Sequence, residues 1–144
     1  MRDLYNNIEV RRGFSPAAAV SDNTAYVSEI IDMRGFKSLV WCILLGINTD
    51  VDMTTVFLME EGDDSGLSDA ADVDDANMDP TEIIAAFDFG DDDSVRKIGY
   101  TGEKRYVRLT ITPSANDSGN IFCAVMALMG DPDQRPTTAQ ATSV

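Results

Sequence analysis

The feature that most constrains this chain is an alternation of apolar and polar residues with a period of two. Such alternation suits β-strands with one buried face, and no stretch has the spacing of a long amphipathic helix. It predicts strands over residues 7–12, 25–33, 36–47, 53–60, 94–100, 104–112 and 120–129, with turn residues between them. The strands at 36–47 and 53–60 are expected to form a hairpin. Residues 81–89 fit either a strand or a short helix.

Seven or eight strands at this regular spacing predict an all-β fold. The expected architecture is a two-layer antiparallel β-sandwich with a jelly-roll-like topology and a long acidic loop. A length of 144 residues suits one domain, and a hydrophobic content of 44% is enough for one core. We expect a single sandwich domain over residues 1–130, with an N-terminal arm. Residues 131–144 are expected to form a polar, mobile C-terminal tail.

The acidic loop is predicted over residues 61–80, EGDDSGLSDAADVDDANMDP, and no Lys or Arg occurs between Glu60 and Asp93. Clustered carboxylates are the ligands that calcium prefers. Residues 72–75 begin like a calcium-binding EF-hand loop, but Ala76 stands at the third ligand position and no Gly follows. The pattern therefore favours a solvated loop and predicts no metal site. Calcium binding, and docking of this acidic surface on a basic partner, stay open as alternatives.

The charge of the chain excludes several classes of function. It has 25 Asp and Glu against 11 Lys and Arg, a net charge of −14 and no His. Such a chain repels nucleic acids and anionic membranes, so we expect neither as a partner. Without His there is no Ser–His–Asp or Cys–His catalysis, and the commonest zinc ligand is missing. A carboxylate pair such as Glu82 and Asp88 resembles a glycosidase site, but an acidic chain offers many such pairs by chance.

We therefore expect no enzyme, no catalytic residues and no cofactor. The longest apolar run, residues 39–47, is too short to span a bilayer. The first residues, MRDLYNN, lack the apolar segment of a secretory signal. This favours a protein that stays in the cytoplasm in which it is made, or that leaves by lysis.

The two cysteines, Cys42 and Cys123, each lie inside an apolar run. They are expected to be buried free thiols, because intracellular proteins seldom keep disulfides. The sequence leaves open whether they face each other across the core.

Two predicted strands, 36–47 and 120–129, are apolar at both odd and even positions. A strand in a sandwich needs only one apolar face. The second face must be covered either by another chain, or by the N-terminal segment and the acidic loop. The sequence leaves both explanations open. In residues 36–47, one side carries Trp41, Ile43, Leu45 and Ile47, and the other carries Val40, Cys42 and Leu44. In residues 120–129, one side carries Phe122, Ala124, Met126 and Leu128, and the other carries Ile121, Cys123, Val125, Ala127 and Met129.

The segment IGYTGEKRYVRLTITPS, residues 98–114, combines three basic residues with two tyrosines. Alternation places Val107, Leu109 and Ile111 in the core and puts Tyr106 and Arg108 on the opposite face. There they can stack or pair with carboxylates of neighbouring strands. We interpret the segment as a feature of the fold that also contributes to an interface, without chemistry of its own.

Several stretches carry a resemblance: MRDLYNNI, DMRGFKSLVWCILLG, FLMEEGDDSG and IGYTGEKRYVRLTIT. Together, over residues 1–132, the chain resembles small structural proteins of tailed phages, the capsid cement or decoration proteins, among them a jelly-roll cement protein of a podophage. The resemblance implies a virion protein on the outer capsid surface, made in the host cytoplasm. It further implies binding to the major capsid protein, reinforcement of the shell, and a homodimer.

The expected function is therefore that of a virion structural protein. Two alternatives stay open: a carbohydrate-binding jelly-roll module, which needs an exposed aromatic platform, and a head–tail connector component, present in few copies. The candidate interface residues are Trp41, Tyr100, Arg105, Tyr106, Arg108, Phe122 and Met126.

Overall fold

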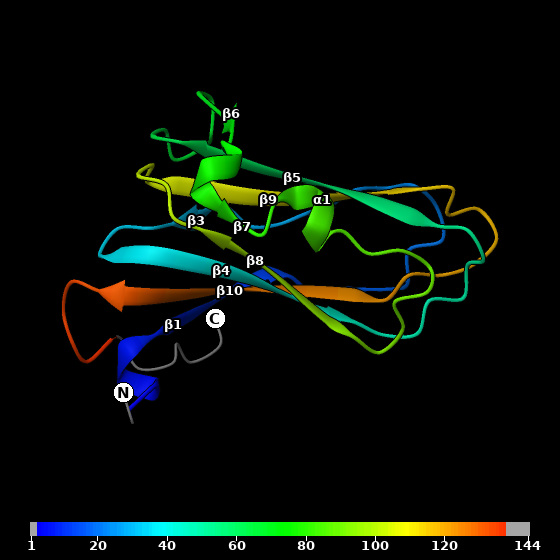
Figure 1. The fold of residues 1–144 in the computed structure, drawn as a ribbon, viewed down its shortest axis with the longest axis horizontal. Coiled ribbons are helices and arrows are strands. Elements are labelled where there is room, and N and C mark those ends of the chain that lie inside the picture. The colour runs from blue at the N-terminus through cyan, green and yellow to red at the C-terminus, as the bar shows by residue number, and fades with distance from the viewer. Residues whose placement is uncertain (1–2, 138–144) are drawn as a thin grey trace.

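The computed structural model describes residues 3–137 and has two antiparallel sheets packed face to face (Figure 1). The first sheet has the order β1 (Glu9–Phe14), β10 (Cys123–Pro132), β4 (Phe36–Leu45), β8 (Val95–Tyr100) and β7 (Met78–Asp79). The second sheet has the order β2 (Tyr26–Val27), β9 (Tyr106–Ser114), β5 (Thr54–Gly62) and β6 (Ala71–Asp72), and β3 (Ile31–Asp32) also pairs with β9. The predicted all-β, jelly-roll-like sandwich is confirmed.

The core lies between the two inner faces and follows the predicted alternation. In β4 the odd-numbered residues Trp41 and Ile43 are buried, and in β9 Val107, Leu109 and Ile111 are buried. Burial of these apolar side chains is the main favourable contribution to folding. The other large, fully buried side chains are Leu39, Met53, Met59, Ile98, Tyr100, Ile121 and Met129.

The predicted hairpin between residues 36–47 and 53–60 is wrong. Strands β4 and β5 lie in opposite sheets, visible as the lower and upper layers of Figure 1. The reason is that β4 is a central strand: it pairs with β10 on one side and β8 on the other, so no edge is left for β5. Residues 46–53 instead carry the chain from one sheet to the other.

Two other predicted segments also differ from the structure. Residues 25–33 form two short strands, β2 and β3, because the chain leaves β9 between them and Glu29 N donates to Gly13 O of β1 at 2.8 Å. Residues 81–89 contain the single-turn helix α1 (Glu82–Ala85), one of the two possibilities that the spacing allowed.

The acidic loop is present but is more ordered than a plain loop. It contributes β6 to the edge of the second sheet and β7 to the edge of the first, with the short helix η2 (Asp75–Asn77) between them. Its apolar residues Leu67, Val73 and Met78 are buried, and most of its Asp side chains point to solvent. The loop therefore spans from one sheet to the other along one side of the sandwich.

The last strand ends later than predicted, because β10 continues to Pro132. Beyond it, Thr137 N donates to Asn6 O at 3.0 Å and Thr137 Oγ1 donates to Ile8 O at 2.7 Å. These bonds tie residues up to 137 to the helix η1 (Tyr5–Asn7) and its flank. The rest of the tail predicted to be mobile, residues 138–144, lies outside the described residues. Over residues 3–137 there is no helix of the length and apolar character needed to cross a membrane.

Candidate interface

The outer face of the first sheet carries the surplus apolar residues. Register partners on neighbouring strands point to the same side of a sheet, so the face can be built row by row. Three rows cross it: Val10, Leu128 and Val40; Arg12, Met126, Cys42 and Lys97; and Ala124, Leu44 and Val95. Phe122 extends the third row beside Gly46, whose N–H donates to Phe122 O at 2.9 Å. These eleven residues are called the apolar face below.

Within residues 3–137 no segment covers the apolar face. Val10, Leu44, Val95, Phe122 and Met126 are between 43% and 66% exposed. The acidic loop runs along the side of the sandwich and η1 lies near the end of β10, so neither hides these side chains. The explanation that these two segments cover the surplus face is therefore wrong. A contiguous apolar surface of this kind is typical of an interaction site, whereas scattered exposed apolar residues are ordinary.

The charge of the apolar face differs from that of the molecule. None of the eleven residues is an Asp or Glu, but the first row continues through Gly99 to the exposed Asp79 of the edge strand β7. Its two charged residues, Arg12 and Lys97, lie at opposite ends of the middle row. Glu29 accepts a hydrogen bond from Arg12.

Two of the seven predicted interface residues, Phe122 and Met126, lie on the apolar face. Trp41 and Tyr100 do not reach the surface: Trp41 is 0% exposed and Tyr100 is buried, because both stand at inward positions of their strands. The prediction that these two residues belong to an interface is wrong. The Tyr100 hydroxyl donates to Glu61 and accepts from Lys104 N at 3.0 Å, and burial raises the pKa of this phenol. Tyr100 thus ties the turn before β9 to β5.

The other three predicted residues, Arg105, Tyr106 and Arg108, lie on or beside the outer face of the second sheet, away from the apolar face. Arg108 donates twice to Glu60 Oε2, at 3.0 and 2.7 Å, across a register pair of β9 and β5. Arg105 donates to both oxygens of Asp32 at 2.9 and 2.8 Å, which lowers the pKa of Asp32. The Arg105 guanidinium also stacks over Tyr106, 4.9 Å from the ring centre. These charges are used within the chain, and their contribution to an interface stays a prediction.

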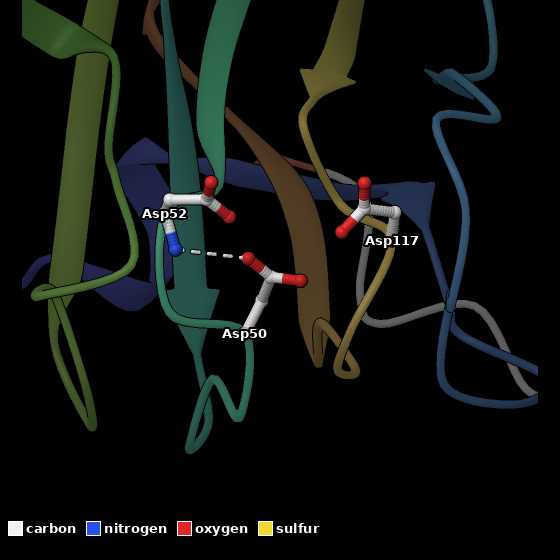
Figure 2. Close-up of side chains that lie close together, drawn as sticks. All are labelled: Asp50, Asp52 and Asp117. Atoms are coloured by element: carbon white, nitrogen blue, oxygen red, sulfur yellow. Dashed lines mark hydrogen bonds between the residues drawn. The ribbon is translucent and has the colours of Figure 1, made fainter.

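Among residues 3–137, one group of carboxylates could hold a metal ion, and it lies in the loops that follow β4 and β9 (Figure 2). Asp50, Asp52 and Asp117 each bring one oxygen within 4.8 Å of the others. The buried Asp50 is already saturated: its Oδ1 accepts from Asp52 N and Met53 N at 3.0 and 2.9 Å, and its Oδ2 accepts from Ser118 N and Oγ at 3.0 and 3.1 Å. These bonds, the one from Asp52 N above all, hold the pKa of Asp50 well below its ordinary value. Asp50 therefore has a structural role: its hydrogen bonds join residues 50–53, between β4 and β5, to Ser118, between β9 and β10.

The residues that the sequence suggested for calcium or glycosidase chemistry have local roles. Asp74 caps η2, accepting from Ala76 N at 2.9 Å. Glu82 accepts from Met59 N, and burial raises its pKa. Asp88 accepts from Gly90 N at 2.8 Å within a turn. Sequence reasoning missed the Asp50 group, because Asp117 is far away in the chain and only folding brings it near.

The cysteines lie on opposite faces of the first sheet. Cys123 is buried in the core, and burial raises its pKa to about 12. Cys42 is half-buried on the apolar face, and partial burial raises its pKa despite the neighbouring Lys97. Both are free thiols, as predicted, but only Cys123 is buried, and they do not face each other across the core.

Two grooves lie at the end of the sandwich where β3 turns into β4, and they share Arg34 and Phe36. Their volumes are about 560 and 440 Å³. The first groove is lined by acidic and basic side chains and the second mostly by basic ones, and several are already paired, as Arg11 is with Glu9 and Arg105 with Asp32. The grooves therefore lack the strongly perturbed convergent groups that mark a catalytic cleft.

Comparison with known proteins supports the fold. No family model matches the chain, and no curated protein sequence matches it. Among solved structures, the PBSX exported protein XepA superposes with a TM-score of 0.53 at 13% identity, over 100% of this chain and 43% of XepA. The CBM22-1–GH10 modules of xylanase 10B from Clostridium thermocellum, complexed with xylohexaose, give 0.47 at 12% identity, over 96% of this chain and 28% of theirs. A family 35 carbohydrate binding module from an environmental isolate gives 0.39 at 9%, over 83% and 78%. This chain thus spans less than half the length of the first two. At 13% identity the similarity to XepA shows the fold alone.

Proposed function

We propose that this protein is a virion structural protein, a capsid cement or decoration protein that binds the outside of a major capsid shell and reinforces it. The observation that carries the proposal is the apolar face, an exposed and contiguous surface on strands β1, β10, β4 and β8. It agrees with the sequence resemblance to cement proteins. The proposed function is binding to the capsid shell, without catalysis.

The proposed mechanism is mechanical. A sheet held by antiparallel bonds on both sides of β4 and β10 is a stiff support for a flat binding surface. A side chain such as Met126, near the middle of this surface, is suited to be a binding hot spot. Since the protein would bind the assembled shell and not its separated subunits, its binding energy would stabilise the assembled state. Many copies around a shell would add avidity when each copy bridges two subunits.

The charge of the molecule fits this location. A net charge of −14 disfavours contact with packaged DNA and suits a surface that faces solvent. Homodimerisation, which the resemblance implies, stays a prediction and would use a two-fold interface. The outer face of the second sheet and the grooved end are both free for it within residues 3–137.

The carbohydrate-binding alternative has less support. It requires an exposed aromatic platform, and the one Trp of the chain, Trp41, is buried in the core. A head–tail connector is present in few copies and a cement protein in many, so the number of copies bound per shell separates the two.

The test is to add the purified protein to expanded capsid shells that lack it and to measure copies bound per shell and the disruption temperature of the shell. We expect saturable binding of many copies and a higher disruption temperature. The variant Met126→Asp should bind poorly, and Thr110→Asp, a matched change on the outer side of β9, should bind normally. A few copies per shell would support the connector role. Clear hits on a glycan array without shell binding would support the carbohydrate role.

A further inference from the structure

Strand β1 forms one edge of the first sheet, because it pairs with β10 and with no other strand. In an antiparallel sheet, the N–H and C=O groups of successive residues point alternately to the two neighbouring strands. Gly46 N donates to Phe122 O at 2.9 Å, so the even-numbered residues of β10 bond to β4 and the odd-numbered residues bond to β1. The register then makes Glu9 and Arg11 the residues of β1 that bond to β10.

The N–H and C=O groups of Val10 and Arg12 therefore point away from the sheet. Within residues 3–137 these groups have no hydrogen-bond partner. The side chain of Val10 is also 55% exposed. A strand edge with unpaired main-chain groups is a template for pairing with another strand, so β1 is a place where a further strand can add to the first sheet.

The sequence of β1 favours a second copy of itself as that strand. A two-fold axis through Val10, perpendicular to the sheet, would pair the two β1 strands antiparallel, with Glu9 of each copy opposite Arg11 of the other. Within one chain Glu9 and Arg11 already form an ion pair, on the side of β1 opposite the Val10 side chain. The two ion pairs would then form a square in which each charge has only opposite charges as neighbours, and such cross-strand pairs are stabilising.

The other two-fold registers lack this match. An axis through Glu9 places two carboxylates directly opposite each other. An axis through Arg11 or Arg12 places two guanidinium groups opposite each other. Like charges directly opposite across a strand pair are destabilising, so the charges of β1 select the axis through Val10.

The uncovered length of the edge fits this register. Glu29 N donates to Gly13 O at 2.8 Å, so the chain around Glu29 limits the edge beyond Arg12. At the other end, Ile8 O accepts from Thr137 Oγ1 at 2.7 Å. A carbonyl oxygen has a second acceptor site, which Arg12 N of the other copy can use. The pairing therefore stays between these two contacts.

From this edge we infer that β1 pairs with β1 of a second copy about a two-fold axis through Val10, which joins two five-stranded sheets into one. Val10 begins the first row of the apolar face, so the apolar faces of the two copies would meet at the axis and form one surface. The inference specifies the homodimer that the proposed function includes, and it places the contact at a strand edge. Because this contact is short, the dimer should be weak and should form at high protein concentration.

Cysteine cross-linking tests the register. Val10→Cys, in a Cys42→Ser background, should form a disulfide-linked dimer under mild oxidation, because directly opposite residues have Cα atoms about 5.5 Å apart, within the span of a disulfide. Arg11→Cys in the same background should cross-link at least about fivefold more slowly, because the two cysteines would be diagonal neighbours about 7–8 Å apart. Val95→Cys is the matched control, an exposed valine on the edge strand β8, and it should cross-link as slowly as Arg11→Cys.

Charge exchange tests the square of charges, with dimerisation measured by sedimentation velocity. Arg11→Glu places a carboxylate at every corner and should weaken dimerisation by about tenfold or more. Glu9→Arg combined with Arg11→Glu restores alternating charges, so the dissociation constant should return to within about threefold of the wild-type value. Urea denaturation of each variant provides the control, because a pair that only stabilised the monomer would change the free energy of unfolding and leave dimerisation unchanged.

The outcomes separate this inference from the proposed function, because the dimer is measured without capsid shells. If Val10→Cys cross-links no faster than Val95→Cys, or if Arg11→Cys cross-links faster, the inference is wrong. If the doubly exchanged variant is folded and stays monomeric, the charges do not guide the pairing and the inference is wrong. Shell binding by a variant that does not dimerise would support the cement function alone, and a dimer that does not bind shells would support the dimer alone.

Discussion

The two outer faces of this sandwich are built on the same kind of backbone but differ in charge. On the second sheet, β9 presents Tyr106, Arg108 and Thr110 beside the exposed Val27 and Val56, and Arg108 is paired with Glu60 of β5. On the first sheet, β10 presents Ala124, Met126 and Leu128 without a carboxylate beside them. The inner faces of both sheets are largely apolar. The comparison shows that the inward residues account for the fold. Outward residues of a strand are usually polar, so the exposed apolar side chains on the outer face of the first sheet mark a surface available for binding.

The largest expected effect is on shell binding, when a charge is placed at Met126 near the middle of the apolar face. Met126→Asp should weaken binding to shells by at least about thirtyfold, since truncating or charging a central hot spot costs about 2 kcal/mol or more. The matched Thr110→Asp, on the other outer face, should change affinity less than about twofold. Equilibrium binding to purified shells, with circular dichroism as the check on folding, measures both. Equal losses for the two variants would show that the outer faces do not differ in function.

The next prediction compares the two sides of one strand. Ile43 faces the core and Leu44 the solvent. Ile43→Ala should lower the free energy of unfolding by about 2–5 kcal/mol, as for other buried aliphatic truncations. Leu44→Ala should cost less than about 1 kcal/mol in the isolated chain. Urea denaturation of both variants tests this, and similar costs would mean that Leu44 is already buried in the free protein.

A third prediction concerns the end that joins the two sheets. The pKa of Asp50 is lowered in the folded protein by its hydrogen bonds, chiefly that from Asp52 N. Its contribution to stability is therefore fully present above the ordinary carboxyl pKa of 3.8 and is lost as the pH falls below it. Asp50→Asn should be less stable than wild type at neutral pH, and the difference should shrink toward pH 2. Urea midpoints at pH 7, 4 and 2 measure it; a constant difference would argue against ionised Asp50 as the tie.

The smallest effect is expected on the outer face of the second sheet. A double-mutant cycle with Arg108→Met and Glu60→Gln should give a coupling energy of about 0.5–1 kcal/mol, because this cross-strand pair is partly exposed. The coupling should fall in 0.5 M NaCl by screening, and shell binding should not change. A loss of shell binding in Arg108→Met would assign this face to the interface as well.

The strands that carry the candidate interface could be predicted from the sequence, but not the full set of residues that lie on it. The alternation predicts a surplus apolar side on residues 36–47 and 120–129, and Phe122 and Met126 lie on the side that the structure leaves exposed. The predicted interface residues Trp41 and Tyr100 lie at inward positions of their strands and are buried. Lys97 and Arg12 were overlooked, because only the register of β1, β10, β4 and β8 shows that they end the same row.

The order of apolar and polar residues was sufficient for the fold class, for most strand positions and for the core side of each strand. These depend on local geometry, since alternate side chains of a strand point to opposite faces. The pairing of strands needed the folded chain: β4 and β5, neighbours in sequence, lie in different sheets. So did the uncovered apolar face and the meeting of Asp50 with Asp117. These depend on which edges are free and on contacts between residues far apart in the chain, and a local pattern carries no information about either.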